Sequence, residues 1–107
     1  MAAHYHLKPS GSEWMFNLKA DNGEVVLTSE RYVAKQGAER GIASVKANSP
    51  LDARYSRLVN SAGKPYFVLK GGNGEPIGTS EAYSSVSARD SGIEVVKRIA
   101  PTAPTRE

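Results

Sequence analysis

One segment decides the fold of this chain, because the chain contains it twice. Residues Trp14–Pro50 read WMFNLKADNGEVVLTSERYVAKQGAERGIASVKANSP, and Pro65–Pro101 read PYFVLKGGNGEPIGTSEAYSSVSARDSGIEVVKRIAP. The two segments align without a gap at an offset of 51 residues, and 15 of the 37 aligned pairs are identical. A repeat of this quality indicates that each copy is one structural unit, which buries its apolar face with the help of the other copy.

Each copy predicts a strand, a hairpin turn, a second strand and a helix, and a further strand precedes each copy. Period-two alternation over Trp14–Lys19 indicates a strand, and Asp21-Asn22-Gly23 supplies the positive φ of a tight hairpin. Ser84 is the expected N-cap of the second helix, whereas its counterpart Val33 cannot cap the first. We expect strands at His4–Lys8, Trp14–Lys19, Glu24–Thr28, Arg54–Asn60, Pro65–Lys70 and Glu75–Thr79, and helices from about Val33 to before Pro50 and from about Ser84.

These elements predict an α+β fold, with two tandem β3-α repeats forming one mainly antiparallel six-stranded sheet and two helices on one face. We expect a single domain over residues 1–100, with repeats at about 4–50 and 54–100. The tail 101–107 is polar and rich in proline, which predicts disorder. The side chains expected to face the helices are Phe16, Leu18, Val26, Phe67, Leu69 and Ile77. The opposite face has no helix to cover it.

The composition excludes several classes of chemistry. The chain has 107 residues, a formal net charge of +3 and no cysteine. The missing cysteines rule out disulfides, thiolate catalysis and cysteine-based metal sites. No stretch approaches 18 apolar residues and no secretory h-region is present, so we expect a cytoplasmic protein without a membrane partner.

Several phrases of the second copy resemble the bacterial YegP-like family. They are Phe67-x-Leu69-Lys70, Asn73-Gly74-x-x-Ile77-Gly78-Thr79-Ser80-Glu81-x-Tyr83 and Ala88-Arg89-Asp90-x-Gly92-Ile93, together with Asp52-Ala53-Arg54-Tyr55 between the copies. The resemblance covers nearly the whole chain. It implies a β3-α unit present twice in one continuous sheet, in a family of unknown function with no established catalytic or binding residues.

Three motifs suggest chemistry, but each has a simpler explanation, which for the histidines is exposure to solvent and for the other two a structural role. His4-x-His6 places two imidazoles on one side of a strand, but no third metal ligand is evident nearby. The glycines of Gly71–Gly74 lead into a strand and not a helix, which favours a hairpin over a phosphate cradle. The hydroxyls of Thr28-Ser29-Glu30 and Thr79-Ser80-Glu81 have no base near them in sequence and suit a strand-to-helix junction. We predict no catalytic residues, no metal and no cofactor.

The uncovered sheet face is the candidate binding site, and the same pattern also suits a solvated face or one that a second copy covers. The expected site residues on it are Tyr55, Arg57, Tyr66, Lys19 and Lys70. The sequence predicts a non-enzymatic interaction module with a macromolecular partner, existing as a monomer or homodimer. The alternative is single-stranded nucleic-acid binding on the same face, where aromatic and basic side chains together stack bases and neutralise phosphates. An enzyme would require a deep polar pocket joining Glu30 or Glu81 to a hydroxyl and a base.

Overall fold

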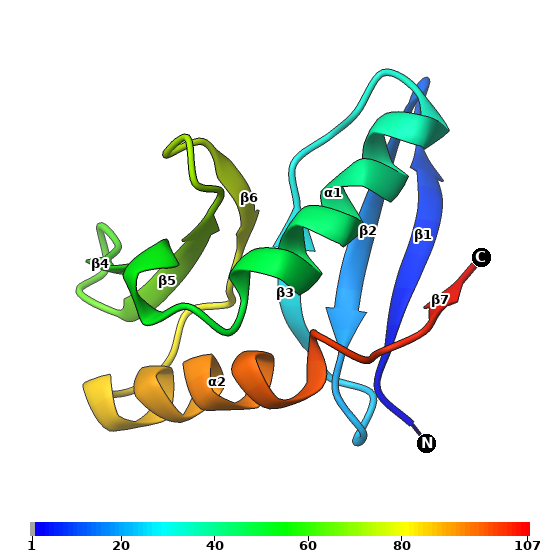
Figure 1. Cartoon of the computed structure of the whole chain (residues 1–107). Coiled ribbons are helices and arrows are strands. Elements are labelled where there is room, and N and C mark those ends of the chain that lie inside the picture. Colours follow the sequence, from blue (N-terminus) through cyan, green and yellow to red (C-terminus); the bar gives the residue numbers. More distant parts are fainter. Residues whose placement is uncertain (1) are drawn as a thin grey trace.

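The computed structural model describes residues 2–107, which form one seven-stranded sheet and two α-helices (Figure 1). In chain order the elements are β1 (His4–Ser10), β2 (Glu13–Lys19), β3 (Val25–Ser29), α1 (Lys35–Asn48), the 3₁₀ helix η1 (Asp52–Arg54), β4 (Tyr55–Val59), β5 (Pro65–Lys70), β6 (Pro76–Thr79), α2 (Val86–Ile99) and β7 (Thr105–Arg106). The strand order across the sheet is β4-β5-β6-β3-β2-β1-β7. Every neighbouring pair is antiparallel except β1 and β7, which run parallel.

The prediction that residues 101–107 are disordered is wrong. Ala103 is buried in the core, and the N–H of Tyr5 donates to the carbonyl of Pro104 at 2.8 Å. Thr105–Arg106 then form β7 beside β1. The sheet is therefore mixed and has seven strands, where six in a mainly antiparallel sheet were predicted. The tail belongs to the folded domain, and residue 1 of the predicted domain lies outside the described residues.

The two hairpins within the repeats share one turn chemistry. Asn22 and its repeat counterpart Asn73 each accept, on Oδ1, the N–H of the residue two positions on, at 3.0 Å. Gly23 (φ 85°) and Gly74 (φ 83°) follow them in the left-handed region, which glycine enters without steric cost. The segment Gly71–Gly74 is thus a hairpin turn, as predicted.

The two helices begin differently. Ser85 caps α2, because its Oγ accepts the N–H of Ala88 at 3.0 Å. The cap is therefore one residue later than the predicted Ser84. Ala34 precedes α1 and makes no side-chain cap bond, as expected for a first helix without a capping hydroxyl.

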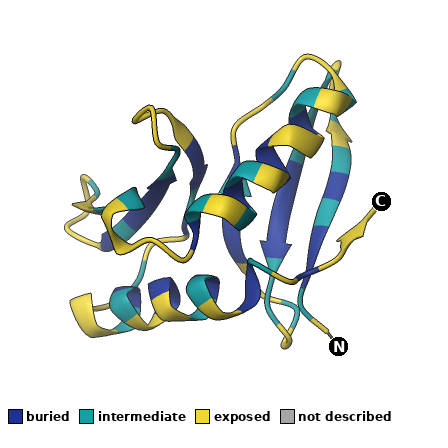
Figure 2. Ribbon diagram, viewed as in Figure 1, coloured by how far each residue is buried: buried dark blue, intermediate teal, exposed yellow. Residues whose placement is uncertain are grey.

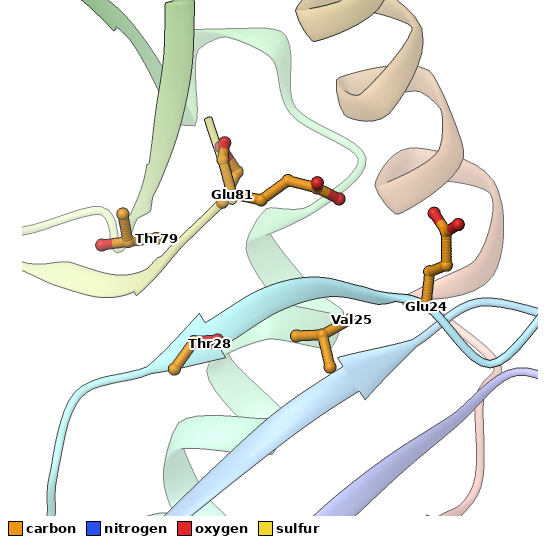
Figure 3. A pocket seen from close by; sticks show the side chains of 6 residues that line it. Glu24, Val25, Thr28, Thr79 and Glu81 are labelled. Atoms are coloured by element: carbon orange, nitrogen blue, oxygen red, sulfur yellow. The ribbon is translucent and has the colours of Figure 1, made fainter. Parts of the chain in front are cut away.

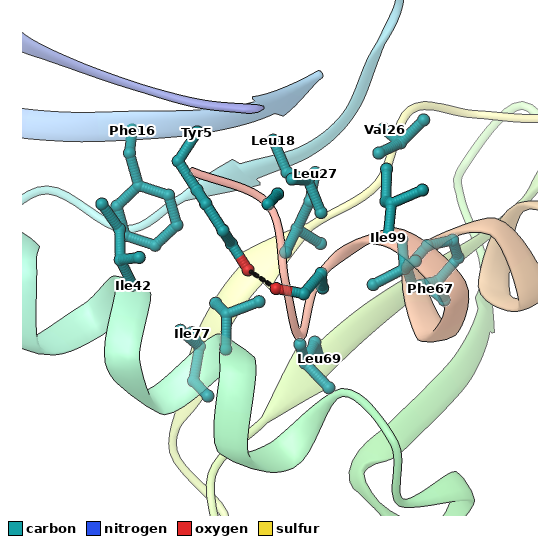
Figure 4. Packing of buried hydrophobic residues seen from close by; sticks show 14 of the residues in the cluster. Tyr5, Phe16, Leu18, Val26, Leu27, Ile42, Phe67, Leu69, Ile77 and Ile99 are labelled. Carbon is teal, nitrogen blue, oxygen red and sulfur yellow. Dashed lines mark hydrogen bonds between the residues drawn. The ribbon is translucent and has the colours of Figure 1, made fainter. Parts of the chain in front are cut away.

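Both helices pack against the same face of the sheet, and the core lies between them and the strands (Figures 1 and 2). All six side chains predicted to face the helices are buried there. Leu27, which the alternation did not assign to this face, joins them because a bulge interrupts the pairing of β2 and β3 after Leu18. Figure 4 shows Leu27 between Leu18 and Val26 in this cluster.

The repeats meet at the centre of the sheet, where β3 and β6 pair. Thr28 pairs with its own repeat counterpart Thr79 in antiparallel register, so an approximate two-fold axis relates the halves. Next to the axis, the first repeat has Leu27 where the second has Gly78. A Cβ atom on Gly78 would lie 2.8 Å from Cγ of Leu27, so the centre holds one leucine and not two.

Each helix ends on a strand of the other repeat. The hydroxyl of Tyr5 in β1 donates to the carbonyl of Ala100 at the end of α2, at 2.7 Å (Figure 4). The hydroxyl of Tyr55 in β4 donates to the carbonyl of Ser49 at the end of α1, also at 2.7 Å. Both tyrosines are buried, and burial raises the pKa of each far above its usual value. These bonds satisfy main-chain acceptors that a helix end leaves unpaired.

The helix glycines make room for the tyrosines of the strand-to-helix junctions. A Cβ atom on Gly41 would lie 2.3 Å from Oη of Tyr32, and one on Gly92 would lie 2.3 Å from Oη of Tyr83. Each tyrosine ring in turn lies nearly parallel to a core phenylalanine, with ring centroids 6.4 and 6.3 Å apart. These glycines therefore let each helix lie close to the sheet, and the junction tyrosines are the groups that come closest to them.

We expect Gly92→Ala to lower the free energy of unfolding by about 1–3 kcal/mol, the usual cost of forcing an extra methyl into a packed site. Gly72→Ala is the matched control, because a Cβ atom there meets nothing closer than 3.5 Å. Urea denaturation of both variants measures the difference. Equal stability of Gly92→Ala and Gly72→Ala would show that Tyr83 can move aside.

We expect Tyr5→Phe and Tyr55→Phe each to lower the free energy of unfolding by about 1–3 kcal/mol, since each leaves a buried carbonyl without its donor. Tyr66→Phe is the control, because no hydrogen bond of the Tyr66 hydroxyl is found among residues 2–107 and the side chain is half-exposed. Denaturation curves with unchanged slope would report the effect as a stability change. A control that loses as much as the other two would contradict the explanation.

Candidate functional site: the open face

The sheet face opposite the helices is called the open face here. Cross-strand pairing fixes its members, because paired residues point to the same side of a sheet. The row that crosses the middle of the sheet consists of His6, Asn17, Thr28, Thr79, Val68 and Ser56. The described helices, α1 and α2, both lie on the other side, so partners can reach this row.

Three of the five predicted site residues lie on the open face, but the structure does not bring them together. Tyr66 and Lys70 are on β5, and Lys19 is on β2. Lys19 pairs with the start of β3, whereas Lys70 pairs with the start of β6. Because β3 and β6 are antiparallel, these two lysines stand at opposite ends of the sheet.

The predicted positions of Tyr55 and Arg57 on the open face are wrong. Tyr55 pairs with Leu69 and Arg57 with Phe67, and both partners face the helices. Tyr55 is only 6% exposed, and its hydroxyl is bonded to the end of α1. The side chain of Arg57 contacts Asp52 instead of a surface for a partner.

Arg57 belongs to a set of charges that joins η1, β4 and α2. Oδ1 of Asp52 accepts from Nη2 of Arg57 at 2.9 Å and from Nζ of Lys97 at 2.8 Å. These two bonds lower the pKa of Asp52 to about 2. Nε of Arg54 donates to Oδ1 of Asn48 at 2.9 Å, which ties η1 to α1 as well. The sequence Asp52-Ala53-Arg54-Tyr55 therefore holds the connection between the repeats in place.

One half of the open face is cationic. The residues that form it, called the cationic strip here, are His4, His6, Lys8 and Lys19 on β1 and β2 and Arg106 on β7. His4 is only 8% exposed, and one carboxylate, that of Glu13 opposite Ser10, shares this face at the far end of the two strands. Desolvation lowers the pKa of His6, and the charges of Lys19, Lys8 and His4 lower it further. All charged groups that act on His6 are thus cationic, which marks a region that favours a bound anion.

The other half of the open face is apolar at the corresponding positions. Leu58 pairs with Tyr66, and Val68 lies next to them on β5. In the first repeat the counterparts of these residues are Lys8, Met15 and Asn17. Leu58 is 39% exposed. The two halves of one symmetric sheet therefore present different chemistry to a partner.

A hollow of about 470 Å³ lies where β3 and β6 separate, near the two-fold axis. Figure 3 shows the carboxylates of Glu24 and Glu81 beside it, with Thr28 and Thr79 in its wall. Its six lining residues include no histidine, lysine or arginine. The carboxylates of Glu24 and Glu81 are the groups of the hollow that could act as a base, and within residues 2–107 neither is hydrogen-bonded to the hydroxyl of Thr28 or Thr79.

The junction serines of the two repeats serve the backbone. Oγ of Ser29 accepts the N–H of Phe16 at 2.9 Å and donates to the carbonyl of Glu30 at 2.7 Å. Ser80 makes the same two bonds with Phe67 and Glu81, at the same distances. The structural explanation predicted for these hydroxyls is therefore confirmed.

His4 and His6 share the open face, as the alternation predicts. Nδ1 of His4 lies 3.1 Å from the carbonyl oxygen of Ala2. Within residues 2–107, no three histidine, cysteine, aspartate or glutamate side chains are grouped so that they could hold a metal ion. The same part of the chain has no helix long and apolar enough to cross a membrane.

The repeat structure and the sequence agree with one family. A family model described as "Domain of unknown function (DUF1508)" matches the chain twice, over residues 10–56 and 60–107. The chain belongs to the DUF1508 family. The matched ranges begin where β1 and β4 end, so each family unit contains a hairpin, a helix and the segment that follows the helix.

Relatives of known sequence and structure support this membership over the whole length. A UPF0339 protein of Bordetella pertussis is 53% identical over 107 residues, which cover 100% of this chain and 96% of the relative. The UPF0339 protein YegP of Escherichia coli O157:H7 is 49% identical over 98 residues, 91% of this chain and 89% of the relative. The resemblance to the YegP-like family is thereby confirmed.

Two solution NMR structures have the same fold. That of a UPF0339 protein from Shewanella oneidensis superposes with a TM-score of 0.92 at 48% identity, covering 99% of this chain and 91% of that one. That of yegP from E. coli, described as a protein of unknown function, gives 0.91 at 44% identity, covering 99% and 92%. Function in the DUF1508 family therefore has to be argued from the site.

Two members of the cationic strip of this DUF1508 chain were missed from the sequence. Lys8 shares its strand face with His4 and His6, so the same alternation that places the histidines could have found it. Arg106 had no such signal, because β7 is only two residues long and follows two prolines.

We expect part of the stability of this DUF1508 domain to depend on ionised Asp52. Its pKa is depressed in the folded state, so this contribution is present above pH of about 4 and is lost as the pH falls toward 2. Asp52→Asn removes this part of the acid dependence. Thermal unfolding of both proteins between pH 5 and pH 2 measures it, and identical acid profiles would contradict the role of Asp52.

Proposed function

We propose that this DUF1508 protein is a non-enzymatic binding module that receives an anionic partner on the cationic strip. The observation that carries the proposal is that strand pairing places Lys8, Lys19 and Arg106 on one face around His6, and the electrostatics of His6 agree with it. Its pKa is lowered by desolvation and by three neighbouring cationic groups, and no carboxylate offsets them. A bound anion would relieve this repulsion, which is the physical basis for attraction at the strip.

The arrangement of the junctions supports a binding role over a catalytic one. Ser29 and Ser80 use their hydroxyls for main-chain bonds, and in the described residues no hydroxyl of the hollow is hydrogen-bonded to the carboxylate of Glu24 or Glu81. A binding module needs only a rigid surface of suitable charge. The seven-stranded sheet supplies the rigid surface, and the strip supplies the charge.

Single-stranded nucleic acid is the less supported partner. Base stacking uses aromatic platforms, and the open face offers Tyr66 alone, because Tyr55 lies in the core. Tyr66 is also on β5, away from the strip on β1 and β2. An acidic protein surface needs no stacking, so we propose an acidic protein as the partner. Cytoplasmic location and a monomeric or homodimeric state remain predictions from the sequence.

The proposal predicts that charge reversal at the strip weakens binding of a defined anionic polypeptide. Poly-glutamate is the probe, and Lys8→Glu and Lys19→Glu are the variants. We expect each to weaken binding roughly fivefold to tenfold, about 1–1.4 kcal/mol. Lys64→Glu, in the exposed β4–β5 turn, is the control with the same change in net charge. Equal losses at all three positions would show that only net charge matters and would contradict the proposal.

A labelled oligothymidylate measured in parallel separates the two partner classes. Binding to phosphate must weaken steeply with salt, because it releases counterions. Tight, strongly salt-dependent binding of the oligonucleotide, reduced by Tyr66→Ser, would favour nucleic acid over an acidic protein. Absence of binding to either probe at low salt would remove the proposal.

The strip also predicts that binding depends on pH. An anion raises the lowered pKa of His6, so protonation and binding assist each other. Affinity for poly-glutamate should therefore increase as the pH falls from about 7 to about 6, above the range in which glutamate itself is protonated. His6→Gln should remove this increase. Titrations at both pH values measure it, and an unchanged pH dependence in His6→Gln would exclude His6 as the titrating group.

A further inference from the structure

We propose that the outer edge of β4 is a docking site for an extended polypeptide segment, which adds to the sheet parallel to β4. The basis is the approximate two-fold symmetry of the fold, which makes β1 and β4 counterparts. The outer edge of β1 is occupied by β7, whereas no strand within residues 2–107 pairs with the outer edge of β4. One of two equivalent positions is thus filled within the chain, and the other is open.

The correspondence of β1 and β4 rests on two observations. Tyr5 and Tyr55 make the same hydrogen bond, each to the last carbonyl of the opposite helix. Leu7 pairs with Phe16, and Arg57 pairs with Phe67, the repeat counterpart of Phe16. β7 therefore shows, within this protein, how a strand docks on this kind of edge.

The edge of β4 has main-chain groups available for such a strand. The carbonyl of Phe67 accepts the N–H of Ser80 on the β6 side of β5, so the main-chain groups of Phe67 face away from β4. In an antiparallel pair, the groups of its partner Arg57 then face away from β5, and so do those of Val59, two residues on. The N–H of Tyr55 is already taken by the carbonyl of Asp52, whereas the N–H of its counterpart Tyr5 holds Pro104. An added strand can therefore use the main-chain groups of Arg57 and Val59 but cannot make the first bond that β7 makes.

The side chains of β4 protect this edge only in part. Exposed edge strands are usually blunted by proline, by lysine or by inward-pointing charges. Arg57 is such an inward-pointing charge, and its guanidinium is bound by Asp52 and Asp90. The residues after it are apolar, with Leu58 39% exposed and Val59 61% exposed. A strand that added to β4 would cover apolar surface as well as pair the free main-chain groups.

A hollow beside the edge would receive side chains of the added strand. It has a volume of about 720 Å³ and is lined by Arg57, Val86, Ser87, Asp90, Ser91 and Glu94. At the equivalent place in the first repeat, the residue after β7 reaches α1, and Oε1 of Glu107 lies 2.7 Å from Nζ of Lys35. The counterpart of Lys35 in the second repeat is Val86, which is 55% exposed.

The second repeat has Val86 where the first has Lys35, and this difference determines which side chain of an added strand fits there. An added strand in the β7 register places its third residue where Glu107 lies in the first repeat. That residue would face Val86 instead of an ammonium group, and it stands near Asp90 and Glu94. Arg57 also lines the hollow, but its charge is already paired with Asp52 and Asp90. The edge therefore selects an apolar side chain at this position and disfavours a carboxylate.

Two peptides test the assignment. They are acetyl-Thr-Arg-Val-Thr-Val-amide and acetyl-Thr-Arg-Glu-Thr-Val-amide, whose first three positions correspond to Thr105–Glu107. We expect the valine peptide, at millimolar concentration, to shift the amide NMR signals of Arg57–Val59 in the labelled protein. The glutamate peptide should bind about two- to fivefold more weakly, the size expected for one exposed charged contact. No shifts with either peptide, or shifts confined to β1, would overturn the proposal.

Two variants make the test specific. Val59→Pro removes an outward N–H that β5 does not use, and should abolish the shifts while the other amide signals persist. Val86→Lys restores the environment of Lys35 and should reverse the preference, with the glutamate peptide now binding more tightly. An unchanged preference in Val86→Lys would overturn the assigned register. Signals of Arg57–Val59 that move with protein concentration alone would instead show β4 pairing with a second copy, and would also overturn it.

Discussion

The fold depends on a pair of reciprocal hydrogen bonds between the repeats. Tyr5 holds the end of α2 and Tyr55 holds the end of α1, so each helix is completed by a strand from the other half. Neither repeat can satisfy its own helix end. This explains why the unit occurs twice in one domain: a single hairpin with one helix leaves both an apolar face and a helix-end carbonyl without partners. The junction tyrosines over Gly41 and Gly92 then fix how closely each helix lies to the sheet.

The two repeats differ at the centre of the sheet because of packing. They also differ on the open face, where packing gives no reason for the difference. Near the axis, two leucines cannot occupy the same space, and Gly78 therefore stands where the first repeat has Leu27. On the open face the side chains point away from the core. The replacement of Lys8, Met15 and Asn17 by Leu58, Tyr66 and Val68 relieves no crowding in the core. Because packing does not require these differences, the open face is where the two repeats can differ in what they bind.

The sequence predicted the repeats, the hairpins and the helix-facing stripe, because those features come from local periodicity and turn chemistry. The prediction misplaced Tyr55 and Arg57 because neither face of β4 is uniformly apolar or polar in sequence. Tyrosine and arginine can each bury the apolar part of the side chain while the polar end stays hydrogen-bonded. Alignment with β1 would have resolved the phase. Measured between equivalent cross-strand pairs, the connection is one residue longer in the second repeat, because Lys8 pairs with Met15 seven positions on and Leu58 pairs with Tyr66 eight positions on. β1 and β4 therefore correspond at an offset of 50 and not 51. β7 was missed because its place is set by a distant strand and by Lys35, and not by its own residues.

The open edge and the open face follow from the same topological fact. A tandem repeat closes its two units on each other at the β3–β6 centre, so the outer strands β1 and β4 remain at the periphery. The chain that leaves α2 can cover only one of these outer strands, and it covers β1, adding Arg106 to the cationic strip as it does so. The same step makes one end of the sheet charged and closed and leaves the other apolar and open. The asymmetry of the molecule therefore arises from where the chain runs after its last helix as much as from differences between the two copies.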